Sequence, residues 1–108
     1  MLFQFIETAA FTRAAERYLD DATYVQLQAQ LNARPECGVL VPGSGGLRKL
    51  RWARDGSGKR GGLRVIYYAL RADGQIWLLA LYSKNVQENI PAHVLKALQE
   101  EIDRARRI

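Results

Sequence analysis

Two apolar runs joined by a turn signal constrain the fold more than any other feature of this chain. Residues 63–70 and 76–82 are apolar at successive positions, apart from Arg64. Strands that are apolar on both faces lie in the interior of a sheet. The Asp73-Gly74 pair between the two runs is typical of a β-hairpin. The sequence therefore predicts two central antiparallel strands around which the other elements are arranged.

Further strands are predicted on either side of this hairpin. Residues 2–6 and 38–41 form short apolar runs of strand length. Residues 47–53 alternate in polarity, so Lys49 and Arg51 are predicted to lie on the same face of their strand. The loop that follows this strand is rich in glycine, which favours turns.

Three helices are predicted from apolar side chains that repeat at helical spacing. The first begins after Thr8, a typical N-cap residue, and ends at the Asp20-Asp21 pair. The second runs toward Pro35, because the residue before a proline disfavours the helical conformation. The third begins at Pro91, since proline is favoured at the first helical position.

The order of these elements indicates one α+β domain over residues 1–108. Runs of strands and runs of helices, in place of strict alternation, are typical of that class. We expect a small, mainly antiparallel sheet with two N-terminal helices and a C-terminal helix. We also expect the helices to cover one face of the sheet and the basic side chains to occupy the other. A length of 108 residues suits a single core.

Basic charge is concentrated between Gly43 and Arg64. This stretch holds seven of the sixteen Lys and Arg residues and one of the eleven acids, so its net charge is +6, against +5 for the whole chain. A patch of this kind favours a phosphate-rich partner. A generic basic face on a small domain stays open as the alternative, because patch charge indicates binding and not chemistry.

Five side chains are candidates for one site on the sheet. They are Lys49, Arg51, Arg64, Tyr82 and Lys84. Pairing across the central hairpin predicts Tyr82 opposite Arg64, with Lys84 on the same face as Tyr82. Lys49 and Arg51 join them if the register aligns their strand with Arg64. A slip of one residue would scatter the five side chains over both faces.

Other common sites do not fit the sequence. Residues 56–61 match G-x-G-x-x-G, but a strand follows where a dinucleotide-binding motif requires a helix. A P-loop is excluded because Lys59 is followed by Arg60 and not by Ser or Thr. Cys37 and His93 have no cluster of further ligands around them. We therefore expect no metal site and no cofactor.

The cysteine count and the lengths of the apolar runs indicate the cellular location. One cysteine cannot form an intramolecular disulfide, which fits a reducing compartment. No apolar run approaches the roughly 20 residues that span a bilayer, and the first residues lack the basic start of a signal peptide. We expect a cytoplasmic protein that does not bind membranes.

Three motifs between Gly45 and Asn85 have counterparts in a known family. They are G-G-L-R-K-L-R-W-A from Gly45, G-K-R-G-G-L-R-V-I-Y-Y from Gly58 and L-A-L-Y-S-K-N from Leu79. The chain resembles the RelE/ParE superfamily, and most of all the HigB-type toxins of bacterial type II toxin–antitoxin modules. The resemblance implies a toxin that cleaves messenger RNA on the ribosome, and a cognate helix-turn-helix antitoxin.

The resemblance also implies roles for the cations. Lys49 and Arg51 match the basic pair on the strand before the loop. Arg64 matches the arginine that opens the next strand and contacts the scissile phosphate. Lys84 falls near the basic position after the last strand, although that position can also be aligned with Asn85.

A tyrosine near the C-terminus serves RelE, but this chain has none after Tyr82. Tyr68 and Tyr82 are therefore the candidates for that role, and Lys49 and Lys84 are further candidates for proton transfer. Contacts with RNA or the ribosome are expected from Arg48, Arg54, Lys59, Arg60 and Tyr68.

The implied reaction is attack of the RNA 2′-hydroxyl on the adjacent phosphate, without a metal, with cations stabilising the developing charge. Two other functions stay open on the same fold, since a fold does not fix a function. One is inhibition of DNA gyrase, as in ParE. The other is binding of nucleic acid without catalysis.

Overall fold

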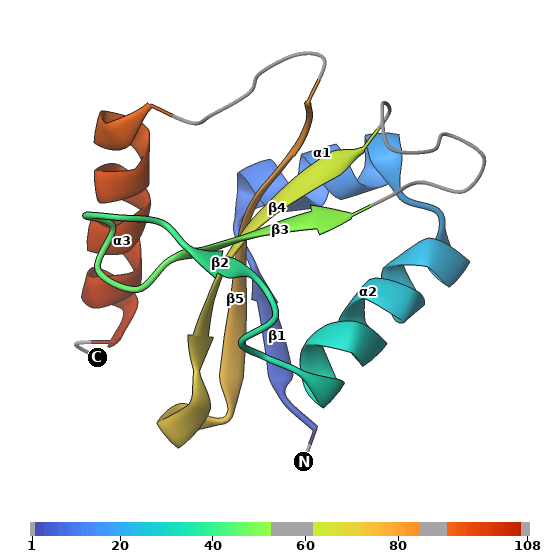
Figure 1. Ribbon diagram of the computed structural model, residues 1–108, viewed down its shortest axis with the longest axis horizontal. Helices are drawn as coiled ribbons and strands as arrows, with labels where there is room; N and C mark the ends of the chain where they lie inside the picture. Colours follow the sequence, from blue (N-terminus) through green and yellow to red (C-terminus); the bar gives the residue numbers. More distant parts are fainter. Residues whose placement is uncertain (1, 53–61, 85–90, 107–108) are drawn as a thin grey trace.

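A five-stranded sheet forms the centre of the computed structural model, which describes residues 2–52, 62–84 and 91–106 (Figure 1). The elements are β1 (Gln4–Glu7), α1 (Ala9–Tyr18), α2 (Asp21–Ala33), β2 (Val39–Leu40), β3 (Arg48–Trp52), β4 (Leu63–Leu70), the 3-10 helix η1 (Arg71–Asp73), β5 (Gln75–Ser83) and α3 (Ala92–Arg106). The strand order is β1-β5-β4-β3-β2, and only the pairing of β1 with β5 is parallel. The predicted α+β class and mainly antiparallel sheet are confirmed.

The hairpin of β4 and β5 lies inside the sheet, as predicted. Each of its strands is bordered by another on its outer side. The turn is made by η1 and by Gly74, whose φ of +67° lies in the left-handed region. Glycine suits this position because it has no Cβ to clash with the following carbonyl.

Among the described helices, none has the length and apolar character needed to cross a membrane.

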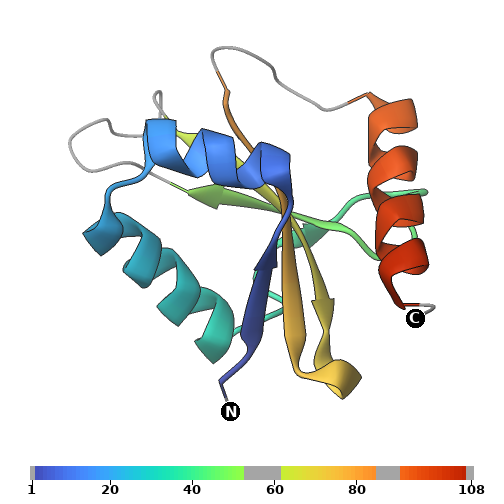
Figure 2. The same cartoon turned by 180° about the vertical axis from the view of Figure 1, so that it is seen from behind.

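Side-chain caps begin α1 and α2 where the sequence predicts them. The Thr8 hydroxyl accepts a hydrogen bond from the Phe11 amide at 3.0 Å. The Asp20 carboxylate accepts one from the Thr23 amide at 2.7 Å. The second helix ends two residues before Pro35. From their junction the two helices diverge, as both views show (Figures 1 and 2).

Helices lie on both faces of the sheet, so the expectation that they cover only one face was wrong. The core beneath α1 and α2 includes Phe11, Leu27, Leu31, Val65 and Leu78. The core beneath α3 includes Ile66, Leu79, Leu95 and Ile102. Both faces of the hairpin are apolar, so a helix must pack on each face to exclude its side chains from water. The third helix therefore shares its face of the sheet with basic side chains.

Candidate active site

One row of side chains crosses three strands on the α3 face. Arg51 of β3 is the register partner of Arg64 in β4, and Arg64 is the partner of Tyr82 in β5. Neighbouring strands lie about 4.8 Å apart, so directly paired residues are adjacent on the sheet. We call these three residues the arginine–tyrosine row. The predicted pairing of Tyr82 with Arg64 is confirmed, and the register brings Arg51 into line with them.

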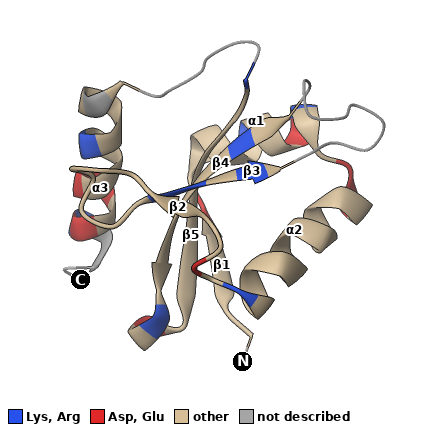
Figure 3. Ribbon diagram, in the orientation of Figure 1, with Lys and Arg blue, Asp and Glu red and all other residues tan. Residues whose placement is uncertain are grey.

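The two lysines of the predicted site lie next to this row. Lys49 pairs with Ile66, one step of the alternation away from Arg51 and on the same face. Lys84 follows Tyr82 by two residues and is half-buried, and its amide donates to the Gly62 carbonyl at 3.2 Å. Figure 3 shows basic segments of β3, β4 and the end of β5 gathered at the same end of the sheet.

Arg64 is the buried member of the row. Its side chain and backbone together are 6% exposed, and its Nη1 atom donates to the Leu63 carbonyl at 3.3 Å. Among the residues that the structure describes, no carboxylate lies within ion-pair distance of it. A buried charge is costly unless it is paired. An arginine held in this way is suited to bind an anion, and its fork of N–H groups matches a phosphate.

Tyr82 and Tyr68 share this face but lie at different distances from the arginines. Tyr82 is half-buried and directly opposite Arg64. Tyr68 lies four residues along β4 from Arg64, about 13 Å at ~3.3 Å per residue. Its ring lies against the turn before β3, because a Cβ built on Gly46 would stand 3.3 Å from it. Of the two predicted tyrosines, only Tyr82 is therefore placed in the row.

Arg48 lies apart from the row although it was predicted as an RNA contact. By alternation along β3 its side chain lies on the face opposite that of Lys49. Its Nη1 atom donates to the carbonyls of Gly38 at 2.8 Å and Glu36 at 3.2 Å. The guanidinium thus ties the chain after α2 to the sheet. The other predicted contacts, Arg54, Lys59 and Arg60, fall outside the described residues, as do the G-x-G-x-x-G segment at 56–61 and Asn85.

A second polar network lies on the α2 face. The Tyr67 hydroxyl donates to the Pro35 carbonyl and accepts from the Gly38 amide, both at 2.8 Å. Burial, with the neighbouring Cys37 thiol, raises the pKa of Tyr67 to about 12, against the opposing effect of the Gly38 amide. The cluster fixes the segment between α2 and β2. Of the predicted site residues, only Arg48 reaches this cluster, through its hydrogen bond to the Gly38 carbonyl.

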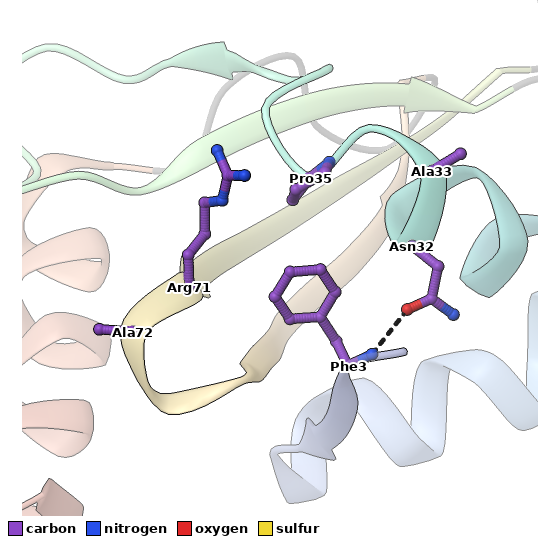
Figure 4. Close-up of a pocket in the computed structure, with 6 residues that line it drawn as sticks. All are labelled: Phe3, Asn32, Ala33, Pro35, Arg71 and Ala72. Atoms are coloured by element: carbon purple, nitrogen blue, oxygen red, sulfur yellow. Dashed lines mark hydrogen bonds between the residues drawn. The ribbon is translucent and has the colours of Figure 1, made fainter. Parts of the chain in front are cut away.

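The hollow shown in Figure 4 lies beside η1, at the other end of the hairpin from the arginine–tyrosine row. Its volume is about 500 Å³. The lining residues are Phe3, Asn32, Ala33, Pro35, Arg71 and Ala72. The Phe3 amide donates to the Asn32 side chain at 2.8 Å, and Arg71 forms an ion pair with Glu36 at 2.8 Å. The charged group that lines the hollow, the Arg71 guanidinium, therefore already has an acidic partner, and none of the five predicted catalytic residues lines it.

Metal-ligating side chains do not cluster in the described part of the chain: no three of His, Cys, Asp and Glu come together there. His93 is exposed on α3, and Cys37 is a half-buried free thiol. The chemical groups that the site does assemble are guanidinium, ammonium and phenol.

Sequence reasoning missed one feature of the site, an irregularity in β5. Tyr67 pairs with Leu78, but its neighbour Ile66 pairs with Ala80, so Leu79 is an extra residue. Such a β-bulge changes which face the following side chains occupy. Two consecutive residues, Leu79 and Ala80, contact the core beneath α3. The sequence carries no signal for it, because every position from 76 to 82 is apolar or aromatic.

Comparisons with known proteins bear on the fold. No family model matches the chain. A free form of the toxin RelE from Escherichia coli, with two arginines replaced by alanine, superposes with a TM-score of 0.58 and 14% identity over 82% of this chain and 90% of that one. An archaeal RelE–RelB complex from Pyrococcus horikoshii superposes with a TM-score of 0.52 and 24% sequence identity. The match covers 78% of this chain and 97% of that one. At identities this low, the structural likeness establishes the architecture alone. The chain has the fold of RelE.

Proposed function

We propose that this chain is the toxin of a type II toxin–antitoxin module and cleaves messenger RNA. The observation that carries the proposal is the arginine–tyrosine row, with Arg64 buried and without a carboxylate partner among the described residues. The RelE fold supports it, as does the sequence resemblance to HigB-type toxins. A site made of cations and a phenol suits a phosphodiester substrate.

The proposed reaction is an in-line displacement at phosphorus. The RNA 2′-oxygen attacks the adjacent phosphorus and loses its proton to a base, and the bond from phosphorus to the 5′-oxygen breaks. The departing 5′-oxygen takes up a proton. The products are a 2′,3′-cyclic phosphate on the upstream fragment and a 5′-hydroxyl on the downstream fragment. No metal or other cofactor is required by this scheme.

Each member of the site has a proposed role in that reaction. Arg64 binds the scissile phosphate, and Arg51 and Lys49 stabilise the negative charge that grows on its oxygens. Tyr82 is the candidate for proton transfer because its ring lies in the row, and Lys84 is the alternative. Among the described residues, the site holds neither a histidine nor a carboxylate pair. We therefore infer that the ribosome orients the messenger, which lowers the barrier by several kcal/mol in comparable cases.

The proposed partners follow from the same assignment. One is the messenger on a translating ribosome in the cytoplasm. The other is a cognate antitoxin, which we expect to carry a helix-turn-helix as in HigB-type modules. The archaeal neighbour is a RelE bound to its RelB, which supports a protein partner for this chain. The motif likeness places the chain nearest to the HigB type.

A translation reaction tests the function. Purified protein is added to a reconstituted system with a defined messenger, and primer extension maps any cuts. We expect cuts inside the reading frame in the presence of ribosomes and few with messenger alone. Inhibition of DNA supercoiling by gyrase, with the messenger intact, would support the ParE-like function. Binding to RNA without cuts or gyrase inhibition would support the non-catalytic one.

A further inference from the structure

The β-bulge at Leu79 determines which side chain of β5 meets Arg64. Next to the hairpin turn, β4 and β5 pair in a register that would place Leu81 opposite Arg64 if it continued. Regular alternation from Leu78, whose side chain lies in the core beneath α1 and α2, would also send Tyr82 to that core. The extra residue shifts the pairing by one position. Tyr82 therefore lies in the arginine–tyrosine row only because of the bulge.

Thr8 holds the main chain of β5 at this bulge. Its hydroxyl donates to the carbonyl of Leu79, the extra residue, at 2.8 Å. Its amide donates to the carbonyl of Leu78 at 3.1 Å. Thr8 directly follows β1, is 8% exposed, and contacts β5 just beyond the last pair of the parallel ladder. Both hydrogen bonds fall on the residues where the register changes.

The Thr8 hydroxyl has a second role, because it also accepts from the Phe11 amide and caps α1. A hydroxyl can donate and accept at once, whereas a carboxylate or an apolar group cannot. Asp20, which caps α2 in the same way, accepts from Thr23 and lies on the exposed side of its helix. The donation to Leu79 therefore separates Thr8 from an ordinary cap, and Asp20 is its matched control.

We propose that Thr8 is a positioning residue: its hydroxyl fixes the β5 bulge and so keeps Tyr82 opposite Arg64. This inference rests on the proposed function in one respect, that Tyr82 takes part in cleavage. The structural half of the inference does not depend on it. Thr8 touches no substrate and acts through the register of a strand whose other end carries Tyr82.

Four variants separate positioning from helix capping. Thr8→Val removes the hydroxyl at nearly constant volume, and Thr8→Ala removes it with less bulk, so a folded variant is available if either packs poorly. Thr8→Ser keeps the hydroxyl. Asp20→Ala removes a cap of α2 and leaves the bulge untouched. We expect cleavage to fall about tenfold in Thr8→Val, because most molecules would no longer hold Tyr82 opposite Arg64. Thr8→Ser and Asp20→Ala should cleave at rates close to that of the wild type.

A double-mutant cycle then asks whether the loss passes through Tyr82. In a Tyr82→Phe background, Thr8→Val should lower cleavage no further, because the phenol that it misplaces is already absent. A purely structural loss would reduce activity by the same factor in both backgrounds. That result would overturn the proposal, as would a Thr8→Val variant as active as the wild type.

Nuclear Overhauser contacts between β4 and β5 test the register without reference to activity. We expect contacts between Arg64 and Tyr82 in the wild type, Thr8→Ser and Asp20→Ala. In Thr8→Val or Thr8→Ala they should weaken, and contacts between Leu63 and Tyr82 should appear, as the unbulged register predicts. Unchanged contacts would overturn the proposal. A wild type that leaves messenger intact would instead remove the proposed function, and the Overhauser contacts would still decide the role of Thr8.

Discussion

The two ends of the β4–β5 hairpin place an arginine in opposite environments. Arg71, beside the turn, has a side chain that is 63% exposed and pairs with Glu36 at 2.8 Å. Arg64, at the other end, is 6% exposed and has no acidic partner among the described residues. An exposed ion pair contributes little to stability. A buried, unpaired cation costs stability unless a ligand neutralises it. From this difference we infer that the Arg64 end is suited to bind an anion, whereas the Arg71 guanidinium already has an acidic partner.

Replacing each of these arginines by methionine tests the comparison directly. The replacement of Arg64 should give the largest loss of cleavage. Arg64→Met should lower messenger cleavage by about 10²–10³-fold, as loss of a main charge-stabilising group does. It should leave the melting temperature unchanged or raise it, because a buried charge with no carboxylate partner among the described residues gives way to an apolar chain. Arg71→Met is the matched control and should cleave normally.

Primer extension and thermal unfolding on the same preparations measure both quantities. Arg64→Ala should likewise abolish growth arrest on expression while the protein stays folded. A folded Arg64→Met variant with normal cleavage, or equal losses in the two methionine variants, would contradict the assignment.

The two tyrosines of the α3 face extend the comparison from cations to the proton-transfer group. Tyr82→Phe should lower cleavage about 10²-fold if its hydroxyl transfers a proton, the lower range for general acid–base catalysis. Tyr68→Phe should have little effect because Tyr68 lies beside Gly46 and not in the row. Single-turnover rates on ribosome-bound messenger measure this. Equal rates for Tyr82→Phe and the wild type would shift the role to Lys84.

Arg51 and Lys49 should contribute less than Arg64. Each substitution by alanine should reduce cleavage roughly tenfold, since the two charges partly substitute for one another in stabilising the phosphate. Arg51 should matter more because it is the direct register partner of Arg64. The double variant should lose more than the product of the single losses, and rates for all three variants test this coupling. Strictly multiplicative losses would show that the two cations act independently.

The smallest effect concerns stability at high pH on the α2 face, away from the row. Burial raises the pKa of Tyr67 to about 12, above the ~10 of an unfolded tyrosine. Folding therefore favours the neutral phenol, and its contribution is fully present below about pH 10 and lost as the pH rises through 12. Urea unfolding across this range should show a steeper loss in the wild type than in Tyr67→Phe. Parallel losses would mean that Tyr67 is not the responsible group, and cleavage by Tyr67→Phe near neutral pH should stay normal.

Much of this fold could be predicted because its determinants are local. Glycine at position 74 and the apolar runs around it specify the hairpin, and Thr8 and Asp20 mark the helix starts. The pairing of Tyr82 with Arg64 was also predicted. The strands next to the turn pair one residue differently, since the register of Leu70 with Gln75 would, if it continued, place Leu81 opposite Arg64. The bulge restores the predicted partner.

The remaining features depend on contacts distant in sequence. An apolar face shows that a cover is needed, but not that α3 supplies it over Ile66 and Leu79. In the sequence, Arg48 is one of several cations on a basic strand. Only the path of the chain after α2 shows that it donates to the carbonyls of Glu36 and Gly38. The bulge itself lies where Thr8 contacts β5 through its hydrogen bond to Leu79, and no pattern within β5 reveals that contact.

The chemical ends of the cleaved messenger test the central claim most directly, namely that cations and a phenol promote attack by the 2′-hydroxyl. Messenger cut in a translation reaction is treated with polynucleotide kinase and labelled phosphate, with and without prior phosphatase. We expect the downstream fragments to be labelled without phosphatase, which shows 5′-hydroxyl ends, and to be absent with Arg64→Met. Fragments that take up label only after phosphatase carry 5′-phosphates, and their production by the purified protein would contradict the proposed mechanism.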